Sequence, residues 1–205
     1  VSAKKDLLVN IGGFLATKDE KVYEKARNMV VVYEGLHTYG GLAGRDLEAL
    51  ARGIEEMVEY DHIRARIKQV EYCGVELEKY DIPLVKPFGG HAIFLDAKKI
   101  LEHIPMNEFP AQTLVAEIYM DSGVRTMERG VVSAGRDAET GEHKYPELEL
   151  VRMTFPRRVY TQAHIDVTVE SVAAILADRK SIKGLKMVYE PEYLRFFQAR
   201  FERIV

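Results

Sequence analysis

The stretch IPLVKPFGGHAIFLDAKKIL, residues 82–101, marks a change in the pattern of the chain. Residues 82–85 and 91–95 are short apolar segments, as expected for strands. Pro87 to Gly90 separates them as a turn, and Asp96 begins a short helix that runs to about Leu101. The stretch therefore predicts a strand, a turn, a second strand and a helix in quick succession.

Before this stretch the pattern is helical. Thr17 and Glu20 form a capping box ahead of a helix over about 18–33. Residues 35–46 contain four glycines and predict irregular structure. Two apolar stripes at helical spacing then predict two long helices that meet near Tyr60.

The first residues and the part after residue 101 carry strand signals. Asp6–Ala16 is apolar around Gly12–Gly13 and predicts two short strands with a tight turn. After residue 101, proline at the first helical position predicts a helix at 109–118, and an apolar stripe predicts another at 162–178, capped by Thr161. The expected strands are 124–127, 149–155, 186–189 and 194–201.

These elements predict an α/β protein. The long helices give way to strand–helix alternation near residue 80, which places a domain boundary there. We therefore expect one part over 1–80 and a smaller α/β domain over 81–205.

Composition narrows the class of protein. The 205 residues are 47% hydrophobic and 30% charged, which indicates a globular chain with a core. No apolar stretch approaches the roughly 18 to 20 residues of a membrane span. A net charge of -3 gives no general attraction to nucleic acid or anionic lipid, so we expect neither as a partner.

The cysteine content bears on the compartment. Cys73 is the single cysteine, which excludes an internal disulfide and fits the reducing cytoplasm. The chain begins at Val1 without a visible secretory signal, so we expect a processed or truncated start.

Lys4–Lys5 is the first candidate for covalent chemistry. A lysine condenses with an aldehyde when it is neutral, and a neighbouring cation favours the neutral form. Such a pair is more often a solvated charge run, so these residue types permit Schiff-base chemistry without requiring it.

Arginines are the candidate anion ligands. Arg152 alternates with Val151 and Met153, so its guanidinium should project from the face opposite to the apolar side chains. It could bind a carboxylate there or be solvated. Arg129 has the same two readings, as do Arg157 and Arg158. We interpret His91 as a hydrogen-bonded packing residue.

Other chemistries lack a motif. The six histidines show no pair at the spacing of metal ligands, which argues against zinc. The chain has no glycine-rich nucleotide loop and no nucleophile elbow. The residues alone lead to a cytosolic α/β protein with arginines that are candidates for anion binding.

A series of motifs carries a resemblance. SAKKD with VNIGGFL, VVYEGLHTYGGLAGRD, GGHAIFLDA, FPAQ, SGVRTMERG, VRMTFPRRVYT and the closing LRFF resemble, in order, the β-eliminating lyases that depend on pyridoxal phosphate. The resemblance covers essentially the whole chain and is specific because many separate motifs agree. It implies the fold-type-I architecture of pyridoxal-phosphate enzymes, here the end of the large domain plus the small C-terminal α/β domain.

The resemblance assigns the cofactor contacts. It implies that Lys5 carries pyridoxal phosphate, that Ser2 lies near its phosphate and that Lys4 is the adjacent cation. It places Asn10 near a potassium site, where the carbonyl of this residue would serve the ion. His91 lies in a shared GGH motif, and the resemblance suggests a part in closing the site.

The substrate contacts follow in the same way. Arg152 matches the arginine that binds the substrate carboxylate. Met127, Arg129 and Phe196 match the positions around the substrate ring, and Leu36 matches a pocket position near a subunit interface. Family members that release phenol have the M-E-R sequence and the paired phenylalanines found here.

The resemblance thus implies β-elimination of L-tyrosine to phenol, pyruvate and ammonium through a quinonoid intermediate. Indole release from tryptophan is the first alternative. The second is an inactive fragment, because family chains are more than twice this long and the resemblance begins at the cofactor lysine. The N-terminal half of the same enzyme and a homotetramer are the implied partners.

Overall fold

The structure, a computed structural model, describes residues 1–205. The chain divides into two units. The first contains Val1–Arg66 and Pro156–Arg158, and the second contains Ile67–Phe155 and Val159–Val205. No helix is long and apolar enough to cross a membrane.

The division falls earlier than the change of pattern near residue 80. The helix α4, Tyr60–Glu78, continues across it, and its later turns bury Val70, Cys73 and Leu77 in the core of the second unit. The apolar stripe of α4 therefore belongs to the second unit, although the helix begins in the first. The assignment of 1–80 and 81–205 to the large and small domains of a longer enzyme stays a prediction.

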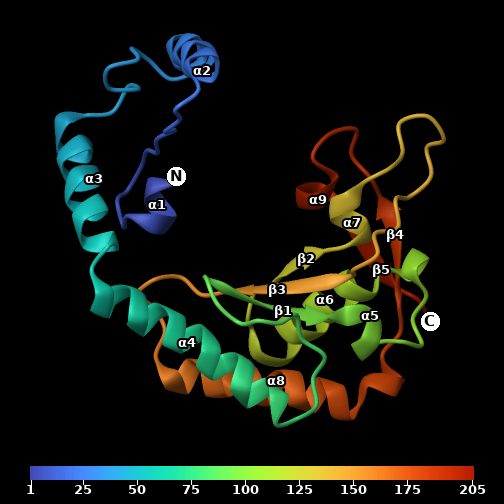
Figure 1. Ribbon diagram of the computed structural model, residues 1–205. Helices are drawn as coiled ribbons and strands as arrows, with labels where there is room; N and C mark the ends of the chain where they lie inside the picture. Colours follow the sequence, from blue (N-terminus) through green and yellow to red (C-terminus); the bar gives the residue numbers. More distant parts are fainter. The chain divides into compact units, whose positions relative to one another are not determined.

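The first unit is built from helices (Figure 1). Besides the start of α4 they are α1 Ala3–Asp6, α2 Glu20–Tyr33 and α3 Gly44–Met57. The helix predicted over 18–33 is confirmed, although Asp19 and not Thr17 is its N-cap. The helices that meet near Tyr60 are confirmed as α3 and α4.

The strands predicted in Asp6–Ala16 are wrong. This segment follows the short helix α1 and makes a single bridge, Ser2 with Gly13. Gly12 has a φ of +105°. Leu7 turns toward α3, where a side chain at Gly53 would come 2.4 Å from the Leu7 carbonyl oxygen. Close contact between α1 and α3, rather than strand pairing, therefore fixes this segment.

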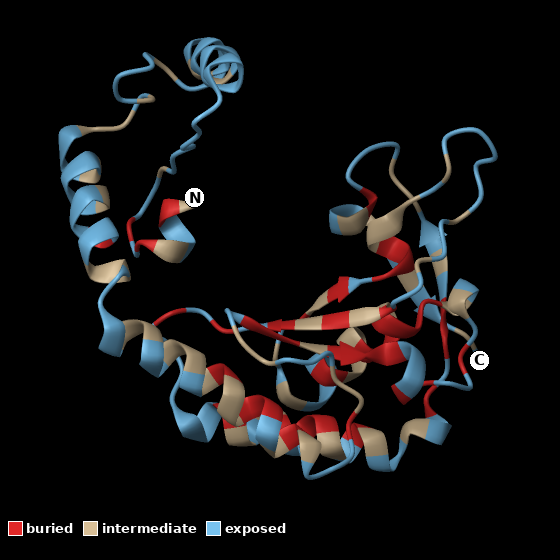
Figure 2. Cartoon of the chain, viewed as in Figure 1, coloured by how far each residue is buried: buried red, intermediate tan, exposed pale blue.

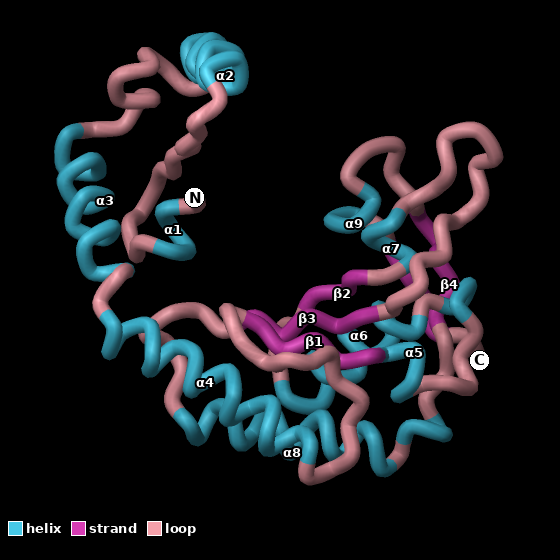
Figure 3. Tube along the Cα trace, in the orientation of Figure 1, coloured by secondary structure: helices cyan, strands magenta, loops and turns pink.

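The second unit contains two antiparallel sheets among helices (Figure 3). One sheet has the order β1-β3-β2, and the other pairs β4 with β5. The strands are β1 Ala92–Asp96, β2 Met127–Arg129, β3 Leu150–Thr154, β4 Leu185–Tyr189 and β5 Arg200–Arg203. The helices are α5 Ala97–Ile100, α6 Pro110–Ser122, α7 Val131–Ala134, α8 Gln162–Ala177 and α9 Arg195–Gln198, with short 3-10 turns at Met106–Glu108 and Arg179–Ser181.

Most of the expected elements are confirmed in this unit, with three exceptions. The expected strand 124–127 shares only Met127 with β2, because the extended pairing with β3 begins at that residue. Residues 82–85 form no strand, because only Leu84 bridges to β1, at Leu95. The expected strand 194–201 is divided into the helix α9 and the strand β5, because Leu194 takes a φ of +57° and turns the chain into a helix.

The core of the second unit lies under one face of the three-stranded sheet. Ile93, Leu95, Val151 and Met153 point from β1 and β3 into a cluster with α4, α6 and α8. The Tyr72 hydroxyl of α4 donates to Asp166 of α8 at 2.6 Å. Figure 2 shows buried residues on the facing sides of these helices, whereas α2 has no buried residue. The opposite face of the sheet carries the candidate site.

Candidate functional site

The outer face of the three-stranded sheet brings together candidate residues of the second unit. Met127 of β2 lies directly opposite Arg152 of β3, which also faces Phe94 of β1. Directly opposed residues in an antiparallel sheet point to the same face, with Cβ atoms about 4.5 to 5.5 Å apart. Arg129, two residues after Met127, shares this face. The sheet therefore places a methionine and two arginines side by side.

Arg152 is poised to accept an anion. It is half-buried between the buried Val151 and Met153, as its alternation predicted. Its Nε is buried and has no hydrogen-bond partner. Burial lowers the pKa of Arg152, and the nearby Arg129 lowers it further. An arginine stays charged at neutral pH, and the Nε of this guanidinium has no acceptor. A bound carboxylate would supply one.

Arg129 lies at the end of β2 with its side chain exposed. Its guanidinium carbon is 5.6 Å from the centre of the Phe196 ring, within the range of a cation–π contact. Phe196 in turn meets Phe197 edge to face, with ring centres 5.0 Å apart. Phe196 is half-buried and Phe197 is exposed, so one ring packs and the other faces solvent.

Two buried carboxylates hold the backbone next to Arg129. Glu128 points inward and accepts hydrogen bonds from the amides of Val132 and Ser133, at 3.1 and 2.9 Å. Glu149 accepts from Val131 N at 2.9 Å and from the first turn of α6, at Ala111 N, at 3.2 Å. The backbone amides at the start of α7 are thus satisfied by two glutamates, Glu128 within β2 and Glu149 just before β3.

The electrostatics of these glutamates follow from burial. Burial raises the pKa of Glu149 to about 7, despite its two backbone donors. Burial also raises the pKa of Glu128, against the hydrogen bonds from Ser133. A carboxyl without a charged partner loses hydration that two amides only partly replace.

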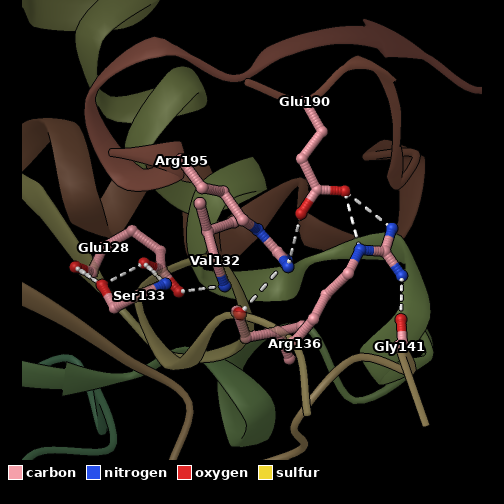
Figure 4. Close-up of polar contacts among 8 residues, drawn as sticks. Glu128, Val132, Ser133, Arg136, Gly141, Glu190 and Arg195 are labelled. Carbon is pink, nitrogen blue, oxygen red and sulfur yellow. Dashed lines mark hydrogen bonds and ion pairs between the residues drawn. The ribbon is translucent and has the colours of Figure 1, made fainter. Parts of the chain in front are cut away.

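A second polar group joins α7 to the C-terminal segment (Figure 4). Arg195 donates from Nη2 to the Val131 carbonyl oxygen at 3.3 Å and from Nη1 to Glu190 Oε1 at 3.1 Å. Arg136 pairs with the other oxygen of Glu190 at 2.7 Å and donates to the Gly141 carbonyl oxygen at 2.9 Å. Arg195 is therefore the buried link of this group and Arg136 its exposed one.

The first unit contains the lysine pair. Lys4 and Lys5 lie on α1 and are exposed, and Ser2 precedes them. The segment is fixed by hydrogen bonds from Ala3 N to the Gly12 carbonyl oxygen, at 3.0 Å, and from Phe14 N to that of Val1, at 3.1 Å. An accessible primary amine on an ordered turn beside a hydroxyl fits an aldehyde cofactor with a phosphate group.

Arg157 anchors the same turn within the first unit. Its side chain is buried, and its guanidinium donates to the backbone oxygen of Asp6, the residue after Lys5. Its Nη2 also lies 3.4 Å from the Asp6 carboxylate. Arg157 is therefore not solvated, and its buried structural contact with Asp6 is neither of the two expected alternatives, while Arg158 is exposed beside His62.

The remaining candidates are exposed. Asn10 lies on a bend after α1, and Leu36 lies in the glycine-rich segment after α2. The structure gives neither residue a specific contact that tests its expected role. His91 is also exposed, and its carbonyl oxygen accepts from Phe155 N at 2.8 Å. Its part in closing a site stays a prediction.

Sequence reasoning missed Glu128, Glu149, Glu190 and Arg195. The signal for Glu149 was present, because it lies two residues before Val151 and therefore takes the inward-facing register of β3. The same rule applies to Glu128, which lies between the outward-facing Met127 and Arg129. Nothing local marks Arg195, whose role depends on the fold.

Comparison with known proteins decides the family. The family described as beta-eliminating lyase matches residues 1–171. This chain belongs to that family. The resemblance of the motifs is therefore confirmed.

The beta-eliminating lyase chain is similar to proteins named tyrosine phenol-lyase. It is 65% identical over 202 residues to that of Nostoc punctiforme, covering 98% of this chain and 43% of the relative. It is 61% identical over 204 residues to that of Symbiobacterium sp., covering 100% and 44%. The tyrosine phenol-lyase of Pasteurella multocida is 57% identical over 202 residues, again at 98% and 44%. The chain spans less than half the length of these curated relatives.

Proposed function

We propose that the enzyme containing this chain eliminates phenol from L-tyrosine and leaves pyruvate and ammonium. The observation that carries the proposal is the pairing of Arg129 with the Phe196 ring, on the sheet face that also presents Arg152. One guanidinium suits a phenolic hydroxyl and the other a carboxylate. The relatives named tyrosine phenol-lyase support the same substrate.

Arg152 binds the carboxylate of the amino acid. Its unpartnered Nε belongs to a planar fork that donates two parallel hydrogen bonds to a carboxylate. This contact fixes the direction of the substrate backbone, and therefore of the Cα–H bond, without taking part in bond breaking.

Arg129 acts on the ring. A phenol leaves from carbon only after its ring has tautomerised: the phenolic oxygen loses its proton and the ring carbon that is released gains one. A guanidinium that donates to the phenolic oxygen stabilises the charge that develops there. Met127 and Phe196 form the apolar surround, which orients the ring and excludes water.

Lys5 carries the cofactor and moves the α-proton. Pyridoxal phosphate, when bound, supplies an aldehyde that condenses with an amine and a ring that accepts an electron pair. Ser2 donates its hydroxyl toward the phosphate, Lys4 is the adjacent cation, and the Lys5 amine takes the α-proton. The complete enzyme is of fold type I in this proposal, and the N-terminal half supplies the rest of the cofactor site.

The substrate test is product analysis of the full-length enzyme with L-tyrosine and L-tryptophan. We expect phenol and pyruvate in equal amounts from tyrosine and no indole from tryptophan. Release of indole without phenol would identify the alternative substrate, and no product from either would favour an inactive protein.

The cofactor test is borohydride reduction of the full-length protein followed by peptide mapping. We expect a pyridoxyl group on Lys5 and none on Lys4. An adduct on another lysine, or none at all, would refute the assignment of Lys5.

Potassium is the second cofactor of the proposal, bound near the carbonyl of Asn10. Asn10 lies on an exposed bend, and its carbonyl oxygen is the ligand that the family resemblance implies. The test is activity in potassium compared with sodium buffers at equal ionic strength. Equal rates would remove potassium from the proposal.

We also propose a homotetramer in the cytoplasm. α2 buries no residue, and Val31, Val32 and Tyr33 expose 50%, 68% and 76% of their surface, which supports a cover from other parts of the assembly. Light scattering of the full-length enzyme tests the tetramer, and cell fractionation tests the compartment.

A further inference from the structure

We propose that Arg195 is a positioning residue that holds the end of β2 and the helix α9 together and thereby keeps Arg129 over the Phe196 ring. This inference rests on the proposed function, which gives Arg129 and Phe196 a substrate ring to bind.

The hydrogen bonds of Arg195 join the two backbones in question. Its Nη2 donates to the carbonyl oxygen of Val131, two residues after Arg129, at 3.3 Å. Arg195 itself directly precedes Phe196 at the start of α9. One side chain therefore spans from the segment that carries the ring to the segment that carries the guanidinium (Figure 4).

The pair needs such a link. Arg129 is exposed at the end of a strand of three residues, Met127–Arg129. Its contact with Phe196, at 5.6 Å, is partly open to solvent, where a cation–π contact is weak. The two side chains cannot fix each other, so their backbones must be held from behind.

The backbone near Arg129 is held on both sides of one residue, Val131. Val131 N donates to the buried Glu149 at 2.9 Å, and the carbonyl oxygen of the same residue accepts from Arg195. Glu149 fixes this residue to the sheet and α6, whereas Arg195 fixes it to α9. Only the second contact relates Arg129 to Phe196.

Glu190 orients the Arg195 side chain. Its Oε1 accepts from Arg195 at 3.1 Å, while its Oε2 accepts from Arg136 at 2.7 Å. Arg136 makes its further hydrogen bond to Gly141 and not to α7. Arg136 therefore shares the same carboxylate but lacks the link, which makes it the matched control.

The chemistry also favours arginine at this position. Arg195 is 9% exposed, and burial lowers its pKa. Burying a charged side chain costs more free energy than burying an apolar one of the same size, so its hydrogen bonds are the reason for an arginine here. A fork with two separated donors can reach Glu190 and Val131 at once, whereas the single ammonium of lysine cannot keep both geometries.

The experiment compares Arg195→Lys with Arg136→Lys in the full-length holoenzyme. L-tyrosine is set against S-methyl-L-cysteine, which has the same carboxylate but a thiolate leaving group and no ring. For Arg195→Lys we expect kcat/KM on tyrosine to fall on the order of tenfold to a hundredfold. We expect kcat/KM on S-methyl-L-cysteine to change by less than about threefold, and Arg136→Lys to leave both substrates within that range. An equal fall on both substrates, or no fall on tyrosine, would overturn the proposal.

Amide hydrogen exchange gives a readout that needs no substrate. In Arg195→Lys, exchange should become faster in residues 130–134 and in residues 195–198 together, and in neither segment for Arg136→Lys. Unchanged exchange in Arg195→Lys would contradict the link between β2 and α9. A wild-type enzyme that released no phenol would instead count against the proposed function and leave the exchange result valid.

A second variant covers the case in which Arg195→Lys does not fold. Glu190→Gln keeps the size of the side chain but weakens its hold on Arg195. We expect the same selective loss on tyrosine with a smaller amplitude, and an equal loss on both substrates would again overturn the proposal.

Discussion

Glu149 shows how a single buried residue can oppose stability while fixing a site. It is fully buried, and its two oxygens accept from α6 and α7 at 3.2 and 2.9 Å. Glu128 and Lys98 are the charged groups that act on it, the first raising and the second lowering its pKa. The protein therefore keeps a carboxyl that titrates near neutrality beside the residues that place Arg129.

Glu149→Gln should remove part of the pH dependence of stability. The pKa of Glu149 is about 7 in the folded chain against an ordinary 4.5, so the folded state binds more protons between these values. The free energy of unfolding should fall as pH rises across this window, by up to about 3 kcal/mol from this group. Urea unfolding at pH 5 and pH 8 measures it.

The control for this prediction is Glu147→Gln, an exposed neighbour on the same segment. It should keep the wild-type difference between the two pH values. If Glu149→Gln also kept that difference, Glu149 would not titrate in this window.

Arg152→Lys should impair all substrates alike, because every amino-acid substrate carries the carboxylate that Arg152 binds. Lysine loses the bidentate geometry, so kcat/KM should fall about tenfold or more on both L-tyrosine and S-methyl-L-cysteine. Steady-state kinetics with the two substrates measure the effect. A loss confined to tyrosine would place Arg152 at the ring instead.

At the scale of elements, periodic patterns predicted the long helices and the inward face of β3. Val151 and Met153 are buried and Arg152 is not, as alternation required. One error occurs where tertiary contacts decide, in Asp6–Ala16, whose Leu7 packs against α3 and not into a sheet. The expected strand 194–201 is wrong for a local reason, because Leu194 has a positive φ and the helix α9 follows it before β5 begins.

The candidate site could be predicted only in part. Arg152 and Arg129 were found as possible anion ligands, and the resemblance supplied their roles. Arg152 lies on the same face as Met127 and Arg129 because of the register between β3 and β2. The register between two separate strands cannot be predicted from their sequences.

Gly130→Ala should separate β2 from α7. A Cβ atom at Gly130 would come 1.8 Å from Glu149 Oε2, and the buried carboxylate has no room to retreat without losing its amide donors. We expect a loss of about 2 to 4 kcal/mol in the free energy of unfolding, measured by urea denaturation.

Gly44→Ala is the control, because a Cβ there meets nothing within 4 Å at the start of α3. It should be neutral or slightly stabilising. Equal effects of the two substitutions would contradict close packing of Gly130 on Glu149.

At the scale of the whole molecule, the two units differ in how much they bury. The second unit has a cluster that joins its helices to one sheet, whereas the core of the first unit contains Ala3, Leu7 and Val9 with Leu50 and Met57 against them. The first unit therefore has the smaller apolar core, and the chain spans less than half the length of each relative.

Hydrogen exchange of the isolated chain should report this difference. Amides of α6, which buries Leu114 and Ile118, should be protected much more strongly than those of α2, which buries no residue. Equal protection of α2 and α6 would show that the first unit is as stable as the second.

The most direct test of the account is Arg129→Ala in the full-length enzyme, assayed for phenol release from L-tyrosine and for pyruvate from S-methyl-L-cysteine. We expect a loss of about a hundredfold or more in kcat on tyrosine, because the developing charge on the ring oxygen loses its donor, with near wild-type turnover of S-methyl-L-cysteine. Full activity on tyrosine, or loss on both substrates, would contradict the assignment of Arg129 to the phenol ring.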